Sequence, residues 1–177
     1  MDGTRVRFIL SDIHEDEIKD EMGFYAFEPT VTLEIEGKNV IEKFGERGVK
    51  SVIIADSIEG TFVGCKRMAG LFERVLSIFT EGEFSFAFNG TGVVINLQRD
   101  GDELEVSMGV DSIGPVGNLK YGDYHLGRVT VVEWIQAVVN LAKEVRDLFK
   151  RHNPRLYAII KKEWFQIGQL ESWLANQ

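Results

Sequence analysis

The sequence predicts an α+β fold in which an antiparallel sheet, including a three-stranded meander at about residues 83–110, packs against two main helices. The helices are expected at about residues 62–80 and 130–152, where apolar residues recur with helical spacing. Strands and helices come in blocks, and the surest strands are joined by hairpin turns, which favours this fold over a doubly wound parallel sheet. With 177 residues, the chain has the length of one domain, residues 1–177.

Two strands are expected near the N-terminus, because apolar and polar residues alternate there. Each strand then has one apolar face: Val6, Phe8 and Leu10 in the first, and Val31, Leu33 and Ile35 in the second. After them, Gly37-Lys38-Asn39 has the composition of a turn. We expect this turn to lead into a short return strand at Val40-Ile41.

The meander is predicted from a hairpin turn at Asp100-Gly101, two residues that tolerate the positive φ angles of a two-residue loop. This turn sets a register that pairs apolar residues: Leu97 with Leu104, Ile95 with Val106, and Val93 with Met108. The preceding strand adds three aromatic residues to the same face: Phe84, Phe86 and Phe88. The loop between this strand and the next consists of either Asn89-Gly90 or the four residues from Asn89 to Gly92. Both loops keep the three aromatic residues on the same face, so only the register between these two strands is open.

The second main helix has the clearest boundaries. Thr130 and Glu133 form the capping-box pattern at its start, and Asn153-Pro154 ends it. The residues after Pro154 form a partly helical segment, which we expect Gly168 to interrupt. A strand at residues 156–160 is the alternative.

Composition excludes several classes of function. The net charge of −8 argues against binding to nucleic acid. Short apolar runs predict no membrane-spanning helix, and the first residues lack the pattern of a signal peptide, so we expect a cytoplasmic protein. The single cysteine, Cys65, cannot form an internal disulfide, and its place on an apolar stripe makes it a core residue and not a nucleophile.

The densest charge lies in residues 12–21, where six carboxylates accompany one lysine and the net charge is −5. The six residues are Asp12, Glu15, Asp16, Glu17, Asp20 and Glu21. Their spacing fails the EF-hand pattern, which requires glycine at the sixth position and glutamate at the twelfth. The cluster is therefore either a solvated surface or a contact surface for another protein with a basic surface.

A long connection, from Asp111 to Gly127, joins the meander to the second main helix. Tyrosine together with Asn, Asp and Gly is typical of recognition surfaces, since rigid aromatic side chains give contact area at low entropic cost. Connections of this length are commonly functional, and an ordinary surface loop is the alternative. The candidate partner-binding residues in it are Asn118, Tyr121, Asp123 and Tyr124.

The first predicted strand ends in Ser-Asp-Ile-His, at Asp12 and His14. This segment of about nine residues resembles the opening of calcineurin-like metallophosphoesterases. The resemblance implies that the two side chains would bind one ion of a dinuclear centre. However, the family's later Gly-Asn-His and Gly-His-x-His elements do not occur in the sequence, and the only other histidines are His125 and His152. We therefore predict no catalytic metal at this position.

These features together favour a non-enzymatic acidic protein-binding module, for example an inhibitor or immunity-type protein that neutralises a basic partner. This hypothesis involves no cofactor, metal or catalytic residue. Two alternatives stay open. One is a metal-assisted, phosphoesterase-like hydrolase that uses Asp12 and His14. The other is a small-molecule-binding domain with an aromatic surface around Phe24-Tyr25-Ala26-Phe27. A homo-oligomer is compatible with all three.

Overall fold

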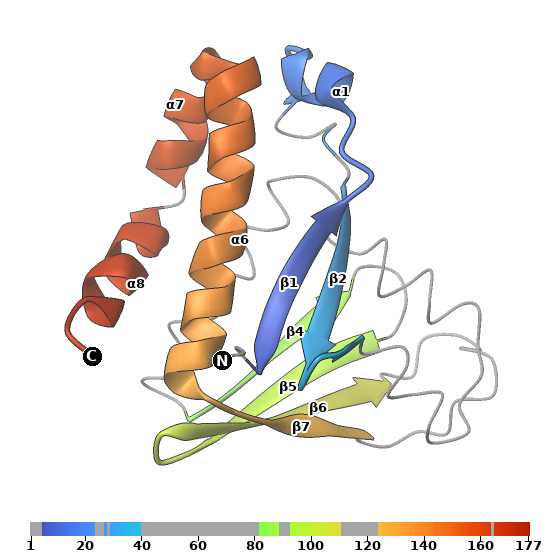
Figure 1. Ribbon diagram of the computed structural model, residues 1–177, viewed down its shortest axis with the longest axis vertical. Coiled ribbons are helices and arrows are strands. Elements are labelled where there is room, and N and C mark those ends of the chain that lie inside the picture. The colour runs from blue at the N-terminus through green and yellow to red at the C-terminus, as the bar shows by residue number, and fades with distance from the viewer. Residues whose placement is uncertain are drawn as a thin grey trace.

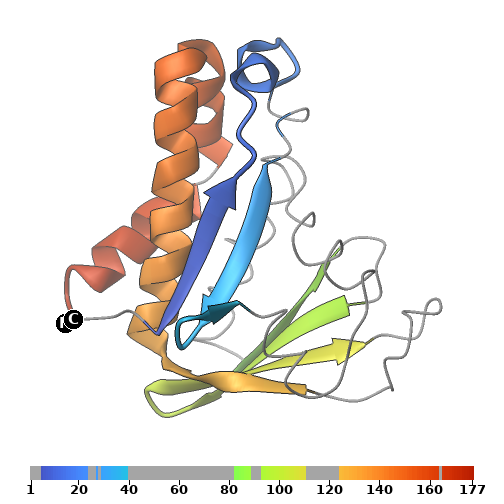
Figure 2. The same ribbon diagram turned by 45° about the vertical axis from the view of Figure 1, so that its right-hand side comes forward.

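The structure is a computed structural model that describes residues 5–23, 27, 29–39, 82–88, 93–110, 124–163 and 165–177. In this part of the chain two antiparallel sheets, with strand orders β1-β2-β3 and β4-β5-β6-β7, accompany the helices, which confirms the predicted α+β class. Figures 1 and 2 show the long helix α6 lying along the first sheet, with the second sheet beneath the N-terminal end of the helix. The helix predicted at about 62–80, with Cys65, falls outside the described residues.

The first sheet is a small antiparallel sheet near the N-terminus. Its strands are β1 (Val6–Ser11), β2 (Thr30–Ile35) and β3 (Lys38–Asn39). In the β1–β2 pair, Val6 lies opposite Ile35 and Phe8 lies opposite Leu33, and all four side chains are buried. The alternation predicted for both strands is therefore confirmed at these positions.

The turn between β2 and β3 differs from the prediction. It consists of Glu36 and Gly37, whose φ angles are 56° and 73°, and pairing resumes at Lys38. A two-residue loop with two positive φ angles matches the twist of the flanking strands, which explains why the chain reverses this early. The return strand predicted at Val40-Ile41 lies beyond the described residues.

The second sheet contains the predicted meander and a fourth strand. Its strands are β4 (Glu83–Phe88), β5 (Val93–Asp100), β6 (Glu103–Val110) and β7 (Tyr124–Thr130). Phe88 lies opposite Val93, so residues 89–92 connect β4 to β5, which settles the alternative that the sequence left open. In this register Phe84 lies opposite Leu97 and Phe86 opposite Ile95.

The predicted register between β5 and β6 is wrong by two residues. The loop consists of Gly101 and Asp102, so that Leu97 lies opposite Val106 and not opposite Leu104. Gly101 has a φ angle of 62° and Asp102 has no positive φ, which is the pattern of a turn with glycine at its first central position. A shift of two residues leaves every side chain on its original face. The predicted buried face is therefore confirmed where side chains are described, at Ile95, Leu97, Leu104 and Val106.

The fourth strand corrects the prediction of a loop that extends to Gly127. Residues 124–127 belong to β7, which pairs with the otherwise open edge of β6. The pairing contains a bulge, because Val106 lies opposite Gly127 while Ser107 lies opposite His125. The extra residue, Leu126, breaks the period-two alternation from which strands are predicted.

Helix α6 (Val131–His152) begins at the predicted capping box. The backbone N–H of Glu133 donates to the Thr130 hydroxyl (3.1 Å), and the backbone N–H of Thr130 donates to the Glu133 carboxylate (2.8 Å). One apolar side of the helix faces β1, where the ring of Trp134 meets that of Phe8 edge to face at 5.6 Å. The buried residues of α6 and of both sheets form one hydrophobic cluster.

Two further helices, α7 (Pro154–Glu163) and α8 (Phe165–Leu174), pack against α6. Residues 156–160 are therefore helical, and the strand considered for them is wrong. The predicted break at Gly168 is also wrong, because this residue lies inside α8. Glycine inside a helix costs only about 1 kcal/mol, which the burial of Ile167 and Leu170 outweighs. Within the described residues, no helix combines the length and apolar character needed to cross a membrane.

Candidate functional site

The six predicted carboxylates lie on and around the short helix α1 (Glu15–Lys19), which follows β1. The chain leaves β1 through Asp12, whose φ angle is 51°, and the three acidic residues of the first helical turn interact favourably with the helix dipole. Five of the carboxylates are exposed and Glu17 is half-buried, whereas Ile18 is completely buried. We call the six residues the acidic helix surface: Asp12, Glu15, Asp16, Glu17, Asp20 and Glu21.

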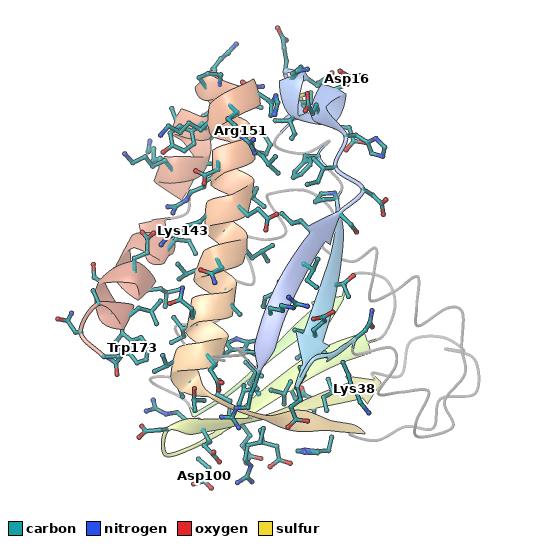
Figure 3. All side chains as sticks on the ribbon, in the orientation of Figure 1. Asp16, Lys38, Asp100, Lys143, Arg151 and Trp173 are labelled. Carbon is teal, nitrogen blue, oxygen red and sulfur yellow. The ribbon has the colours of Figure 1, made fainter. Side chains whose placement is uncertain are left out.

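The acidic helix surface is fixed to the junction of α6 and α7. The side-chain amide of Asn153 donates to the carbonyl oxygens of Ile18 (2.9 Å) and Asp20 (3.3 Å). The Asn153 amide oxygen in turn accepts from the backbone N–H of Leu156 (3.2 Å) and caps α7. One side chain thus joins three helices, and it holds the acidic residues at the upper end of the molecule in Figure 3.

Two basic side chains approach Glu15. Lys19 Nζ lies 3.3 Å from Glu15 Oε2 one helical turn away, and His152 Nδ1 lies 3.6 Å from the same oxygen. The two long side chains of the Lys19 pair are about half exposed, so this pair contributes only about 0.3–0.5 kcal/mol. Within the described residues, Asp16 and Glu21 have no ion-pair partner. Because five of the six carboxylates are exposed, most of the local negative charge faces solvent.

An exposed apolar side chain accompanies these charges. Met22 is 59% exposed, and its backbone N–H donates to Asp20 Oδ1 (2.7 Å). The next residue, Gly23, is close-packed, since a Cβ atom there would lie 2.7 Å from the Ile18 carbonyl oxygen and 3.1 Å from Leu156 Cδ1. This close approach fixes the turn that presents Met22, a flexible side chain of a type well suited to protein contacts.

The structure does not bring the end of the predicted recognition loop to α1. Tyr124 opens β7, where its backbone pairs with Met108. Figures 1 and 2 both show α1 and β7 at opposite ends of the molecule. Asn118, Tyr121 and Asp123 lie outside the described residues.

Two other sequence hypotheses concern aromatic residues and metals. Phe27 is completely buried against Phe149, with ring centroids 5.6 Å apart, so it belongs to the core and not to an aromatic surface. Phe24, Tyr25 and Ala26 fall outside the described residues. In the described part of the chain, no three His, Cys, Asp or Glu side chains gather closely enough to hold a metal ion.

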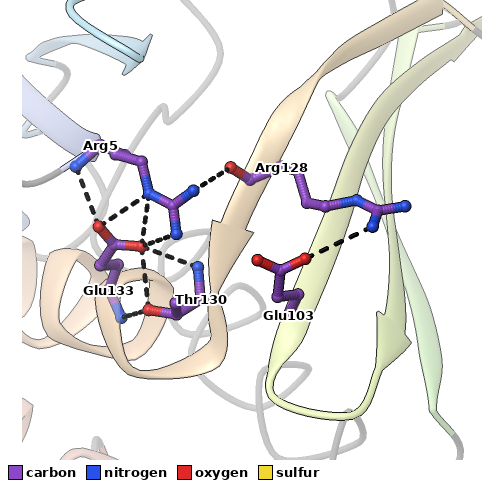
Figure 4. Close-up of polar contacts among 5 residues, drawn as sticks. All are labelled: Arg5, Glu103, Arg128, Thr130 and Glu133. Carbon is purple, nitrogen blue, oxygen red and sulfur yellow. Dashed lines mark hydrogen bonds and ion pairs between the residues drawn. The ribbon is translucent and has the colours of Figure 1, made fainter.

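Sequence reasoning missed a polar network at the start of α6, shown in Figure 4. Arg5 Nη2 donates to Glu133 Oε2 (2.9 Å), and Arg5 Nε lies within 3.2 Å of both oxygens of that carboxylate. Arg5 Nη1 also donates to the carbonyl oxygen of Arg128 (3.2 Å). The network thereby ties the start of β1 to the junction of β7 and α6. No local pattern could reveal a contact between residues this far apart in sequence.

The network sets the charge state of Glu133. Partial burial raises the pKa of this carboxyl group, but hydrogen bonds from Arg5 and Thr130 outweigh it and hold the pKa at about 2. The same carboxylate raises the pKa of Arg5, chiefly through the hydrogen bond between them. Glu133 is therefore a fixed anion near neutral pH, with its lone pairs engaged in structural contacts and not in proton transfer.

Beside this network, charged residues form a ladder across β6 and β7. Arg128 Nη1 lies 3.4 Å from Glu103 Oε2, and Arg128 Nη2 lies 3.8 Å from Glu105 Oε2. His125 Nδ1 lies 3.2 Å from Glu105 Oε1. All four side chains are about half exposed, so each pair contributes at most about 1 kcal/mol. Carboxylates of β6 therefore face basic side chains of β7, and these four residues leave no concentrated charge on their face of the sheet.

Comparison of the chain with family models, curated proteins and solved structures found no match.

Proposed function

We propose that this chain is a non-enzymatic protein-binding module whose acidic helix surface contacts a basic partner, in the manner of an inhibitor or immunity-type protein. The observation that carries the proposal is the group of exposed carboxylates held in place by Asn153. A contact surface that is already ordered loses little conformational entropy on binding.

Charge and apolar area have different roles in this proposal. The net charge of −5 on residues 12–21 attracts a basic protein before contact and accelerates association. Met22, at 59% exposure, supplies apolar area that a partner can bury once the two proteins have met. An inhibitor needs only to cover a basic surface on its target, so no catalytic group is required.

The test uses the proteins encoded by the genes adjacent to that of this chain, each purified and measured for binding by biolayer interferometry at 50 and 300 mM NaCl. Asp16→Lys/Glu21→Lys should lower the association rate constant at low salt by about tenfold or more. Raising the salt should reduce this difference, because the screening length falls to below about 10 Å. An inhibitor should also suppress the toxicity of the partner when the two are produced together.

The matched control is Asp100→Lys/Asp102→Lys, which changes the net charge equally at the exposed β5–β6 hairpin. This variant should associate nearly as fast as wild type. Equal losses in both variants would show that only the overall charge matters, and the acidic helix surface would then not be the contact site. The proposal is contradicted if none of these neighbouring gene products binds.

A further inference from the structure

The acidic helix surface has a basic counterpart on the neighbouring helices. Five exposed cations lie on the last turn of α6 and on α7, and we call them the basic helix surface: Lys150, Arg151, Arg155, Lys161 and Lys162. Arg155 and Lys162 share one face of α7 with Ile159, at helical spacings of four and three residues. Ile159 is 43% exposed, so this face offers apolar area between positive charges.

These cations have few acidic neighbours. Within the described residues, no ion pair involves any of the five, and Arg151 Nε donates only to the carbonyl oxygen of Asp147 (3.3 Å). The nearby Arg146 differs, because it is largely buried and pairs with Glu171 at 3.2 Å. The basic helix surface is therefore an unpartnered helix face with a positive charge close in size to the negative charge of the acidic helix surface.

The two surfaces adjoin each other. Asn153, which lies between Arg151 and Arg155 in sequence, donates to the carbonyl oxygen of Ile18, and His152 approaches Glu15. Figure 3 shows Asp16 and Arg151 toward the same end of the molecule. That end therefore carries a negative half and a positive half side by side.

We infer that this end of the molecule binds a second copy of the chain in a two-fold symmetric dimer. A two-fold rotation places the acidic helix surface of each copy against the basic helix surface of the other, so the attraction occurs twice. The described residues include three exposed large apolar side chains, Met22, Val132 and Ile159. Met22 follows α1 beside the acidic helix surface, and Ile159 lies on α7 within the basic helix surface. They supply the apolar area that an interface needs inside a charged rim.

The test is sedimentation equilibrium of the purified full chain at 50 and 500 mM NaCl. We expect dimers at low salt and a dimer dissociation constant at least about tenfold higher at 500 mM, since exposed charges are screened. Asp16→Lys/Glu21→Lys changes the net charge of residues 12–21 from −5 to −1, and Arg155→Glu/Lys162→Glu changes that of the basic helix surface from +5 to +1. Each variant alone should therefore dimerise at least about tenfold more weakly than wild type at 50 mM NaCl. An equimolar mixture of the two variants should dimerise more tightly than either variant alone, because the unchanged basic helix surface of one then meets the unchanged acidic helix surface of the other.

The mixture also guards against misfolding, since a variant that fails to fold cannot restore association. Asp100→Lys/Asp102→Lys serves as the control and should dimerise like wild type. A monomeric wild-type chain at 50 mM NaCl, a mixture that stays monomeric, or assemblies larger than two copies would each overturn the inference. The experiment contains no foreign protein, so its failure leaves the proposed binding of a basic partner untouched. If both are correct, the partner and the second copy compete for the acidic helix surface.

Discussion

Removing the charge of Glu133 should weaken the fold by an amount that depends on pH. Glu133→Gln keeps an oxygen that can accept from the backbone N–H of Thr130, because glutamine also serves in capping boxes. It removes the negative charge with which Arg5 pairs at 2.9 Å. The substitution therefore separates the contribution of the ion pair from that of the helix cap.

The expected magnitude follows from the pKa of Glu133, which falls from 4.5 to about 2. At about 1.4 kcal/mol for each pH unit, the fall corresponds to at most about 3.5 kcal/mol of unfolding free energy. The side chain of Arg5 is 39% exposed, so solvent screens the pair. We therefore expect Glu133→Gln to lower the free energy of unfolding at pH 7 by about 1–2 kcal/mol.

The pH dependence provides the sharper assay. Because the pKa of Glu133 is lower in the folded state, its contribution is present above pH 4.5 and is lost as the pH falls toward about 2. Urea unfolding at pH 7 and pH 3 should show the difference between wild type and Glu133→Gln shrinking by more than about half. A double-mutant cycle with Arg5→Met should assign most of the difference to the pair. A difference that is equal at both pH values would refute this reasoning.

Three further predictions concern backbone and capping positions, each measured by thermal or urea unfolding. Gly23→Ala should lower the free energy of unfolding by about 1–3 kcal/mol, because its Cβ atom would lie 2.7 Å from a carbonyl oxygen of α1. Gly168→Ala should raise it by about 0.5–1 kcal/mol, because a Cβ atom there would have no other atom within 4 Å. Asn153→Ala should cost about 1–2 kcal/mol and speed amide exchange in α1; unchanged exchange would contradict its role in joining the helices. Gly101→Ala should cost about 1–2 kcal/mol because φ is 62°, and Gly101→Asn should cost less.

The fold was predictable where a pattern is local. The capping box of α6 involves residues three apart, and the faces of β5 and β6 follow from alternation alone. The register was not predictable with the same certainty, because Asp100-Gly101 and Gly101-Asp102 are both plausible two-residue loops. Strand β7 escaped detection because the bulge at Leu126 interrupts its alternation.

The candidate site was predictable only in part. The carboxylates of residues 12–21 are visible as composition, but their attachment through Asn153 joins positions more than one hundred residues apart. The sequence also separates the acidic residues from Arg151 and Arg155, so their adjacency depends on tertiary structure. A charge pattern predicts which surfaces attract a partner, whereas packing decides which of them lie together.

The late position of α6 in the chain has a consequence for synthesis. The apolar face of the first sheet includes Phe8, which packs on Trp134, and the capping box at the same helix end holds Arg5. Roughly 100 residues separate the first sheet from α6, and at about 5–20 residues per second the ribosome needs roughly 5–20 s to make them. During that time the N-terminal hairpin lacks the helix that covers it. A nascent chain stalled before α6 should therefore bind chaperones that recognise exposed apolar strands, and release of the chain should coincide with emergence of α6 from the ribosome.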